Sequence, residues 1–263
     1  MRNYLVTGAG GGMGRALCRA LAKEGHRIWG IDRAGVPAEA GTRLICADIT
    51  CPEEIAAAFE TVRQEAGELH GIIHTAGIYD LGSLAEMPEE EFLRDFNVNL
   101  FGMFRVNRTF LPILAGKGRI VMISSELAPL SPLPFTGIYA LTKSAVEDYA
   151  KALRMELQLL GHSVTVVRPG AVKTAMLPAS VEKLERFCAD TRLYRVSAGR
   201  FRKIVEAVES RGVPPEKIAE VIARELRARR PRLTRNVNRN PLLLLYQLLP
   251  ERMKLWAIRK ILS

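Results

Sequence analysis

The stretch Tyr4-Leu5-Val6-Thr7-Gly8-Ala9-Gly10-Gly11-Gly12-Met13-Gly14 carries the strongest structural signal in the chain. It begins like a buried strand, and from Met13 to Lys23 apolar residues recur at helical spacing. A glycine turn between a strand and a helix presents backbone N–H groups at a helix N-terminus, where a pyrophosphate binds well and a side chain would hold it off. The stretch therefore predicts a dinucleotide site. The residues expected to hold the ligand are Gly8, Gly10, Gly11, Gly12, Met13 and Gly14.

Outward from this turn, short β-rich segments alternate with longer segments of helical pattern. The expected strands are Asn3–Thr7, Arg27–Ile31, Arg43–Cys46, Gly71–His74, Arg119–Ile123, Ser163–Val167 and a short one at Arg232–Leu233. The expected helices are Met13–Lys23, one that begins at Pro52, Phe92–Leu114, Ile138–Leu160 and one from Pro214 to Arg229. Gly116 and Gly161 follow two of them, where left-handed caps are favourable. The alternation predicts a parallel sheet with helices on both faces.

The composition excludes several classes of protein. With 48% apolar and 25% charged residues, the 263-residue chain is ordinary globular protein and is neither disordered, collagenous nor disulfide-rich. The longest nearly unbroken apolar run, Leu242 to Leu249, is far shorter than the ~18 residues of a spanning helix, and the start shows no signal-peptide pattern. Four cysteines without CxxC spacing argue against structural zinc. We therefore expect a cytoplasmic protein without a metal site.

The chain is expected to form one domain over residues 1–263, because no repeat or low-complexity linker interrupts it. Residues 175–213 break the alternation, and residues 236–263 are apolar and basic by turns, which predicts a helical extension. Most of the formal net charge of +10 lies in residues 211–263, which hold 13 Lys and Arg against 4 Asp and Glu. Such a segment is compatible with nucleic acid, an anionic membrane surface, an acidic partner, a second subunit or a solvated surface.

Asp32 ends the second expected strand, 18 residues after Gly14. An acidic residue at this position can accept both ribose hydroxyls of adenosine and repels the 2′-phosphate of NADP, so the sequence favours NAD. Arg33 keeps NADP open, because a guanidinium there could grip a phosphate. Asp48 and Ile49, after the third strand, are candidates for the adenine edge, and a helix cap is the alternative for Asp48.

Tyr139-Ala140-Leu141-Thr142-Lys143 places a phenol and an ammonium four residues apart, and therefore on one face of a helix. A nearby cation favours phenolate, so Lys143 is expected to lower the pKa of Tyr139 and to make it a usable general acid and base. As an isolated pair, the two residues would more often be an exposed helix face. Their interpretation depends on the motifs around them.

Four motifs occur in the order found in the short-chain dehydrogenase/reductase family. They are Gly8-xxx-Gly12-x-Gly14, Asn99 in Asn97-Val98-Asn99-Leu100, Ser124-Ser125 at a strand end, and Tyr139-xxx-Lys143. The chain strongly resembles this family over residues 1–174. The resemblance implies a doubly wound, Rossmann-type α/β fold with a mainly parallel, seven-stranded sheet.

The resemblance also implies roles for particular residues. Tyr139 would transfer a proton to or from the substrate oxygen, which Ser125 would steady. Lys143 would hold the nicotinamide ribose and lower the pKa of Tyr139, and Asn99 would hold a water that links Lys143 to solvent. The expected cofactor contacts extend to Thr75, Ala76 and Gly77 beside the adenosine, and to Pro169, Gly170, Val172 and Thr174 beside the nicotinamide.

Three features depart from the family pattern. His74-Thr75 replaces the usual Asn-Asn, and we interpret His74 as a structural residue with a local hydrogen bond. Ser125 lies 14 residues before Tyr139, one more than usual, which the proline-rich loop between them can absorb. Ser124 and Ser131 are the weaker candidates for this position. The C-terminus is also longer than in compact members of the family.

Residues 175–213 occupy the place of the family's substrate lid. Their apolar side chains favour a hydrophobic substrate, although lid helices need such residues for their own core as well. These residues are Met176, Leu177, Leu184, Phe187, Leu193, Tyr194 and Phe201.

The leading hypothesis is an NAD(H)-dependent oxidoreductase that acts on the alcohol or ketone of a steroid-, retinoid- or lipid-like substrate. The alternatives are a 3-oxoacyl thioester reductase, for which the basic segment would dock an acidic carrier, and a catalytically silent nucleotide-binding module. The resemblance implies a homodimer or homotetramer through the helices Phe92–Leu114 and Ile138–Leu160. No nucleic-acid partner is expected, and the C-terminal segment is a candidate for peripheral membrane contact.

Overall fold

The structure, a computed structural model, describes residues 1–33, 39–174 and 176–263, and the side chains of residues 176–179 also lie outside its description. The expectations for the side chains of Met176 and Leu177 therefore fall outside the described residues. Within these residues, parallel strands form one seven-stranded sheet in the order β3-β2-β1-β4-β5-β6-β7. The strands are β1 (Asn3–Thr7), β2 (Arg27–Asp32), β3 (Thr42–Cys46), β4 (Leu69–His74), β5 (Leu114–Ile123), β6 (Ser163–Pro169) and β7 (Thr234–Val237).

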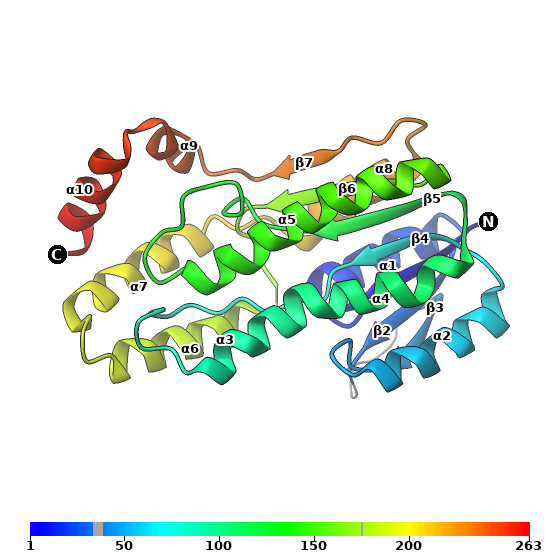
Figure 1. Ribbon diagram of the computed structural model, residues 1–263, viewed down its shortest axis with the longest axis horizontal. Coiled ribbons are helices and arrows are strands. Elements are labelled where there is room, and N and C mark those ends of the chain that lie inside the picture. The colour runs from blue at the N-terminus through cyan, green and yellow to red at the C-terminus, as the bar shows by residue number, and fades with distance from the viewer. Residues whose placement is uncertain (34–38, 175) are drawn as a thin grey trace.

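Helices cover both faces of this sheet, so the predicted doubly wound α/β fold is confirmed (Figure 1). One face carries α2 (Pro52–Ala66), α4 (Met103–Phe110) and α5 (Gly137–Leu157), and the other carries α1 (Gly12–Lys23) and α8 (Pro215–Arg227). The remaining helices are α3 (Glu89–Phe96), α6 (Met176–Asp190), α7 (Arg195–Glu209), α9 (Pro241–Leu248) and α10 (Glu251–Leu262).

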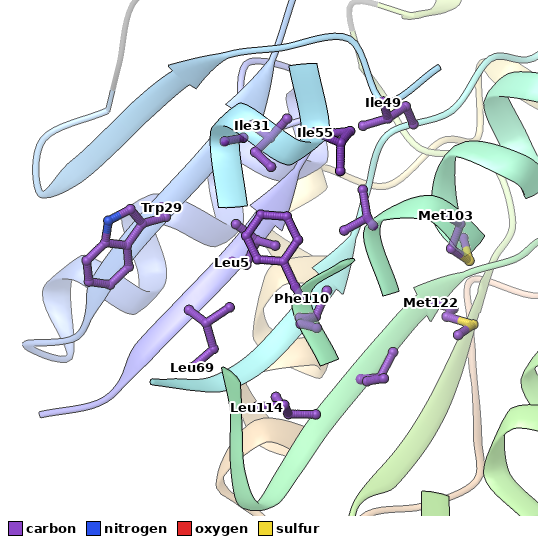
Figure 2. Close-up of a cluster of buried hydrophobic side chains, with 14 of the residues drawn as sticks. Leu5, Trp29, Ile31, Ile49, Ile55, Leu69, Met103, Phe110, Leu114 and Met122 are labelled. Atoms are coloured by element: carbon purple, nitrogen blue, oxygen red, sulfur yellow. The ribbon is translucent and has the colours of Figure 1, made fainter. Parts of the chain in front are cut away.

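Alternation along β1 explains the two layers. Successive side chains of a strand point to opposite faces of a sheet. Leu5 accordingly packs in the cluster beneath α2 and α4, together with Trp29 and Phe110 (Figure 2), whereas Tyr4 and Val6 pack in the cluster beneath α1 and α8. Burial of each such side chain contributes roughly 1.5–3 kcal/mol, which fixes the register of the central strands.

The expected helix Phe92–Leu114 is wrong in its details. The helical segment begins earlier, at Glu89, passes through a π-helical stretch, η1 (Asn97–Gly102), and continues as α4 only to Phe110. A 3-10 turn, η2 (Leu111–Ile113), contains Pro112 and ends the helix, so Leu114 and Gly116 belong to β5. The positive φ of this region, 61°, falls on Lys117 instead of Gly116.

The second glycine cap is confirmed, because Gly161 closes the 3-10 turn after α5, η3 (Gln158–Leu160), with a φ of 80°.

The expected last strand needs correction. It is Thr234–Val237 and not Arg232–Leu233, and the backbone N–H of Arg232 donates to the Glu225 carboxylate at 2.7 Å instead of to a strand. The break in the strand–helix alternation that was expected over residues 175–213 takes the form of two successive helices, α6 and α7. Leu184 and Phe201 bury their side chains against Phe135, which gives these helices a small core of their own.

Candidate active site

The glycine turn lies where β1 ends and α1 begins, and its glycines meet neighbouring backbone directly. Gly8 has a φ of 69°, and a Cβ there would lie 2.6 Å from the backbone nitrogen of Ala76. A Cβ on Gly14 would lie 2.0 Å from the carbonyl oxygen of Gly8, and one on Gly12 would lie 2.9 Å from the Cβ of Thr174. The turn therefore has no room for side chains, as a backbone cradle for a dinucleotide requires. Ala76 and Thr174, which were both predicted to contact the cofactor, therefore lie next to this turn.

Asp32 lies against this turn from the end of β2. Its carboxylate accepts hydrogen bonds from the backbone N–H of Gly10 at 2.7 Å and from that of Arg33 at 2.8 Å. Each oxygen keeps a lone pair for a further donor, so the carboxylate can receive ribose hydroxyls. Its charge disfavours a phosphate at the same place. These features fit the adenosine end of an NAD molecule.

Asp48 and Ile49 do not form one contact surface. Asp48 accepts from the backbone N–H of Thr50 at 2.8 Å and from its hydroxyl at 2.7 Å. Burial opposes ionisation, but these hydrogen bonds and the charge of Arg33 bring the pKa of Asp48 below its usual range. Ile49 is buried in the core, where a Cβ on Gly102 would lie 2.7 Å from its side chain. The carboxylate of Asp48 therefore suits the predicted adenine contact, and Ile49 could contribute to it through its backbone and not through its side chain.

Asn99 lies in the π-helical segment η1 and is almost fully buried. Its Oδ1 accepts from the backbone N–H of Ile78 at 2.8 Å, and its Nδ2 donates to the Ile78 carbonyl at 3.0 Å and to the Thr142 hydroxyl at 3.1 Å. A π-turn inside a helix redirects one residue, and here it turns Asn99 toward the loop after β4. A Cβ on Gly77 would lie 3.0 Å from the Asn99 Oδ1 and 3.5 Å from the Lys143 Nζ, so both polar groups face this glycine.

Lys143 is buried on α5, one turn after Tyr139. Its Nζ donates to the carbonyl oxygen of Ile123, at the end of β5, at 3.1 Å. Burial lowers the pKa of Lys143 to about 8, and no ion pair is found for it among the described residues. A buried amine with one neutral acceptor keeps donors for other groups. The Nζ lies 5.6 Å from the centre of the Tyr139 ring.

The phenol of Tyr139 is in hydrogen-bonding reach of the Ser125 hydroxyl. Burial raises the pKa of Tyr139 to about 12, and the hydrogen bond with Ser125 acts in the opposite direction. Lys143 was expected to lower the pKa of Tyr139, but burial raises it, and the group that lowers it is Ser125 instead of Lys143. At neutral pH the tyrosine is therefore a phenol that can donate a proton.

The structure separates the three candidate serines. The hydroxyl of Ser124 donates to the backbone carbonyl of Lys143 at 3.3 Å and is directed into α5. The hydroxyl of Ser131 accepts from Lys254 of α10 at 3.3 Å. Ser125 is the one of the three that acts on Tyr139, whose pKa its side-chain hydrogen bond lowers, and its Oγ also accepts from the backbone N–H of Leu127 at 3.2 Å. Ser125 therefore stays the candidate for this position.

His74 and Thr75 serve the framework of the site. The Nε2 of His74 lies 2.8 Å from the Oδ1 of Asn107, whose Nδ2 donates to the Tyr149 hydroxyl at 3.2 Å. Burial lowers the pKa of His74 to about 4, so its ring is neutral and donates to Asn107. The Thr75 hydroxyl donates to the carbonyl of Thr7 at 2.7 Å, which joins β4 to β1 beneath the glycine turn. The hydroxyl of Thr75, which was predicted to contact the cofactor, thus donates its proton to the backbone of β1.

The segment at the end of β6 is held to β7 by its backbone and meets the glycine turn through Thr174. Gly170 donates to the Val237 carbonyl at 2.8 Å, and a Cβ on it would lie 2.1 Å from the Asn238 carbonyl oxygen. Pro169 accepts from the backbone N–H of Glu126 at 2.9 Å. The side chain of Val172 packs in the core. Of the four residues predicted here, Thr174 is the one that meets the glycine turn.

Sequence reasoning missed Tyr79. Its ring lies edge-on to the Tyr139 ring with centres 4.6 Å apart, and its backbone carbonyl accepts from the Ser180 hydroxyl of α6 at 2.9 Å. Asp80, the next residue, pairs with Arg94 of α3 and with Lys183 of α6. The loop after β4 therefore joins Tyr139 to α6. No spacing in the sequence signals the contacts with α6, because their partners are 101 and 103 residues apart in the chain.

The chain belongs to the short-chain dehydrogenase family, whose model matches residues 2–185. The family is one of oxidoreductases that use NAD or NADP.

Three known proteins illustrate the relationship. The chain is 29% identical over 229 residues to a 3-ketodihydrosphingosine reductase of Bacteroides thetaiotaomicron, which covers 86% of this chain and 84% of that protein. It is 35% identical over 186 residues to the bovine 17-beta-hydroxysteroid dehydrogenase type 6, covering 65% of this chain and 57% of that protein. Among solved structures, a variant of actinorhodin polyketide ketoreductase with NADPH is 28% identical, with a TM-score of 0.70, covering 90% of this chain and 95% of that one.

Proposed function

We propose that this protein is an NAD(H)-dependent oxidoreductase that interconverts the alcohol and ketone of an apolar, lipid- or steroid-like substrate. The observation that carries the proposal is the convergence of Asn99, Ser125, Tyr139 and Lys143 at the carboxyl ends of β4 and β5. Asn99 and Lys143 face Gly77, and Tyr139 lies close to both Lys143 and Ser125. A phenol, a hydroxyl and a buried amine at this edge can move one proton to or from an oxygen atom. The glycine turn that would hold a dinucleotide opens at the same edge.

Tyr139 would act as the acid in reduction. Because burial keeps it protonated, its phenol can give a proton to the substrate oxygen as negative charge develops there, while the Ser125 hydroxyl holds that oxygen. The resulting phenolate would be stabilised by the ammonium of Lys143. Asn99 would position the loop after β4, and the remaining lone pair on its Oδ1 can hold a water beside Lys143. A nicotinamide bound at this edge supplies or accepts the hydride.

For the cofactor, the glycines and Met13 of the turn would hold the pyrophosphate, Asp32 the adenosine ribose, and Asp48 the adenine. Ala76 and Gly77 would form the floor, and residues 169–174 would receive the carboxamide. NAD is favoured because the Asp32 carboxylate, which lies against the glycine turn, would repel a 2′-phosphate bound beside it. The exposed guanidinium of Arg33 leaves NADP as the alternative.

An apolar substrate is supported by the Tyr79 ring, which lies edge-on beside Tyr139. In this proposal residues 175–213 are the substrate lid and residues 236–263 a helical extension of one domain, 1–263. Two relatives named above act, by their names, on a ketodihydrosphingosine and on hydroxysteroids. The polyketide ketoreductase relative favours a second candidate, a 3-oxoacyl thioester reductase.

The proposal also includes self-association and the location of the protein. The exposed Phe101, Phe104 and Met155 on η1, α4 and α5 suit an interface between copies in a homodimer or homotetramer. Gel filtration with a single monomer peak would contradict it. A cytoplasmic protein with peripheral membrane contact is the location that we propose.

Two experiments test this function. Titration with NADH and with NADPH, followed by nicotinamide fluorescence, is expected to give tighter binding of NADH, and Asp32→Ser is expected to narrow the difference. Tyr139→Phe should then abolish turnover of long-chain and steroid ketones while NADH binding stays nearly unchanged. Tyr149→Phe is the matched control, because it removes a phenolic hydroxyl from the same helix away from Ser125. Turnover that survives in Tyr139→Phe, or reduction of acyl thioesters alone, would contradict the proposal.

A further inference from the structure

The two last helices turn one side toward the protein and leave the other side open. Along α10, Lys254, Ile258 and Leu262 follow one another at intervals of four, which places them on one stripe. The Nζ of Lys254 donates to Ser131 at 3.3 Å, and Ile258 and Leu262 join the apolar core of α6 and α7. This stripe fixes α10 on α7, at the end of the molecule remote from the N-terminus (Figure 1).

The opposite stripe of α10 combines a tryptophan with cations. Arg252, Trp256 and Lys260 also follow at intervals of four, and all three are exposed. The Trp256 side chain is 62% exposed, although a large aromatic residue of this kind is rarely left in water. Arg259 lies exposed beside it.

Helix α9, which precedes α10 in the chain, also exposes apolar side chains. Leu242, Leu245 and Leu248 are exposed, Leu248 at 81%, and the segment from Pro241 to Leu249 contains no charged residue. The Asn240 side chain accepts from the backbone N–H of Leu242 at 3.0 Å, and Gln247 accepts from the backbone N–H of Ser131 at 3.2 Å, so α9 is held in place. We call the combined surface the C-terminal face. It consists of Leu242, Leu245, Leu248, Arg252, Leu255, Trp256, Arg259 and Lys260.

We propose that the C-terminal face docks on the surface of an anionic phospholipid bilayer. Leucine and tryptophan side chains suit the boundary between headgroups and acyl chains, and arginine and lysine suit anionic headgroups. Within the described residues, no helix is long and apolar enough to cross a membrane. The contact is therefore one of helices lying along the surface. A second copy fits this face less well, because two copies would bring their own Arg252, Arg259 and Lys260 together.

Docking through the C-terminal face would also place the bilayer near the candidate active site, an inference that rests on the proposed function. Beneath α10, Phe201 of α7 contacts the ring of Phe135, whose centre lies 5.3 Å away, in the loop that leads to Tyr139. A bilayer against the C-terminal face would therefore lie at the end of the molecule where α7 contacts the loop that leads to Tyr139.

Tryptophan fluorescence tests the docking directly. The chain has two tryptophans, of which Trp29 is 1% exposed and serves as a constant background for Trp256. Vesicles of phosphatidylcholine with 30% phosphatidylglycerol are expected to shift the Trp256 emission to the blue and to carry the protein in flotation. Trp256→Glu removes the fluorophore, so this variant is tested by flotation alone, in which it should no longer be carried with the vesicles. Each cation contributes about a fivefold gain in affinity, so Arg252→Gln with Lys260→Gln should weaken binding about 25-fold.

The matched control is Leu159→Glu, which puts the same charge on a leucine that is 83% exposed between α5 and β6. It should bind vesicles like the wild type. Tyr139→Phe should also bind normally, so that a failed reaction and a failed docking can be told apart. Absence of any blue shift would overturn the proposal, and so would equal binding to pure phosphatidylcholine vesicles. A Trp256-dependent dimer in sedimentation without vesicle binding would assign the face to a second copy instead.

Discussion

The histidine beneath the active site gives a test of the framework that supports it. His74 is buried, and its Nε2 lies 2.8 Å from the Asn107 Oδ1. Burial lowers its pKa from 6.5 to about 4, a depression of about 2.5 pKa units. A group with a depressed folded-state pKa contributes stability above its unfolded pKa, and this stability is lost as the pH falls toward the folded value. Between pH 8 and pH 4.5, the titration of His74 should therefore lower the unfolding free energy of the wild type by about 2–3 kcal/mol.

His74→Gln isolates this contribution. The glutamine amide can still donate to Asn107 but does not titrate, so the variant is expected to keep the portion of stability that the wild type loses in acid. Urea unfolding at pH 8 and pH 4.5, followed by Trp29 fluorescence in a Trp256→Phe background, gives both free energies. His162→Gln is the control at a less buried histidine. If the wild type and His74→Gln lost the same stability in acid, the ring would not be held neutral. Loss of turnover in His74→Gln at pH 8 would contradict its structural role.

Three further changes test the site more briefly. Gly14→Ala would place a Cβ 2.0 Å from the Gly8 carbonyl oxygen, and NADH titration should show affinity at least about tenfold weaker. Asn99→Ala removes three hydrogen bonds from a buried side chain and leaves backbone groups unpaired, so urea unfolding should show a loss of about 2–3 kcal/mol together with reduced turnover. Burial and the neighbouring Asp80 raise the pKa of Asp95 to about 7. The unfolding free energy of the wild type should therefore fall as the pH rises from 4 to 7. Asp95→Asn cannot titrate at this position, so urea unfolding should show a smaller fall for the variant over the same range.

Local patterns were sufficient for much of the site. The glycine turn could be predicted because strand, turn and helix N-terminus are adjacent in the sequence, and the close approach of Gly8 to Ala76 follows from the sheet order. The pair Tyr139 and Lys143 could be placed on one face because α5 is a regular helix. Where the physics is local, the sequence is informative.

Contacts between distant segments could not be predicted in this way. The π-helical segment depends on the hydrogen bonds of Asn99 to Ile78 and Thr142, which lie 21 and 43 residues away in the chain. Helices α6 and α7 interrupt the strand–helix alternation, and their core is completed by Phe135 and by residues of α10. The apolar residues of this segment indicated a substrate pocket, but Leu184 and Phe201 are used for packing. Composition does not distinguish the two uses.

The largest difference between sequence and structure concerns the sign of a pKa shift. From spacing alone, Lys143 should lower the pKa of Tyr139, but burial raises the pKa of the phenol to about 12 and lowers that of the amine to about 8. Burial thus favours the neutral form of both groups. In reduction, the protonated phenol of Tyr139 can donate its proton directly. In oxidation, Tyr139 must first become a phenolate, and burial makes this charged form unfavourable. Carbonyl reduction should therefore proceed at neutral pH, and alcohol oxidation should accelerate as the pH rises, because only oxidation needs Tyr139 without its proton.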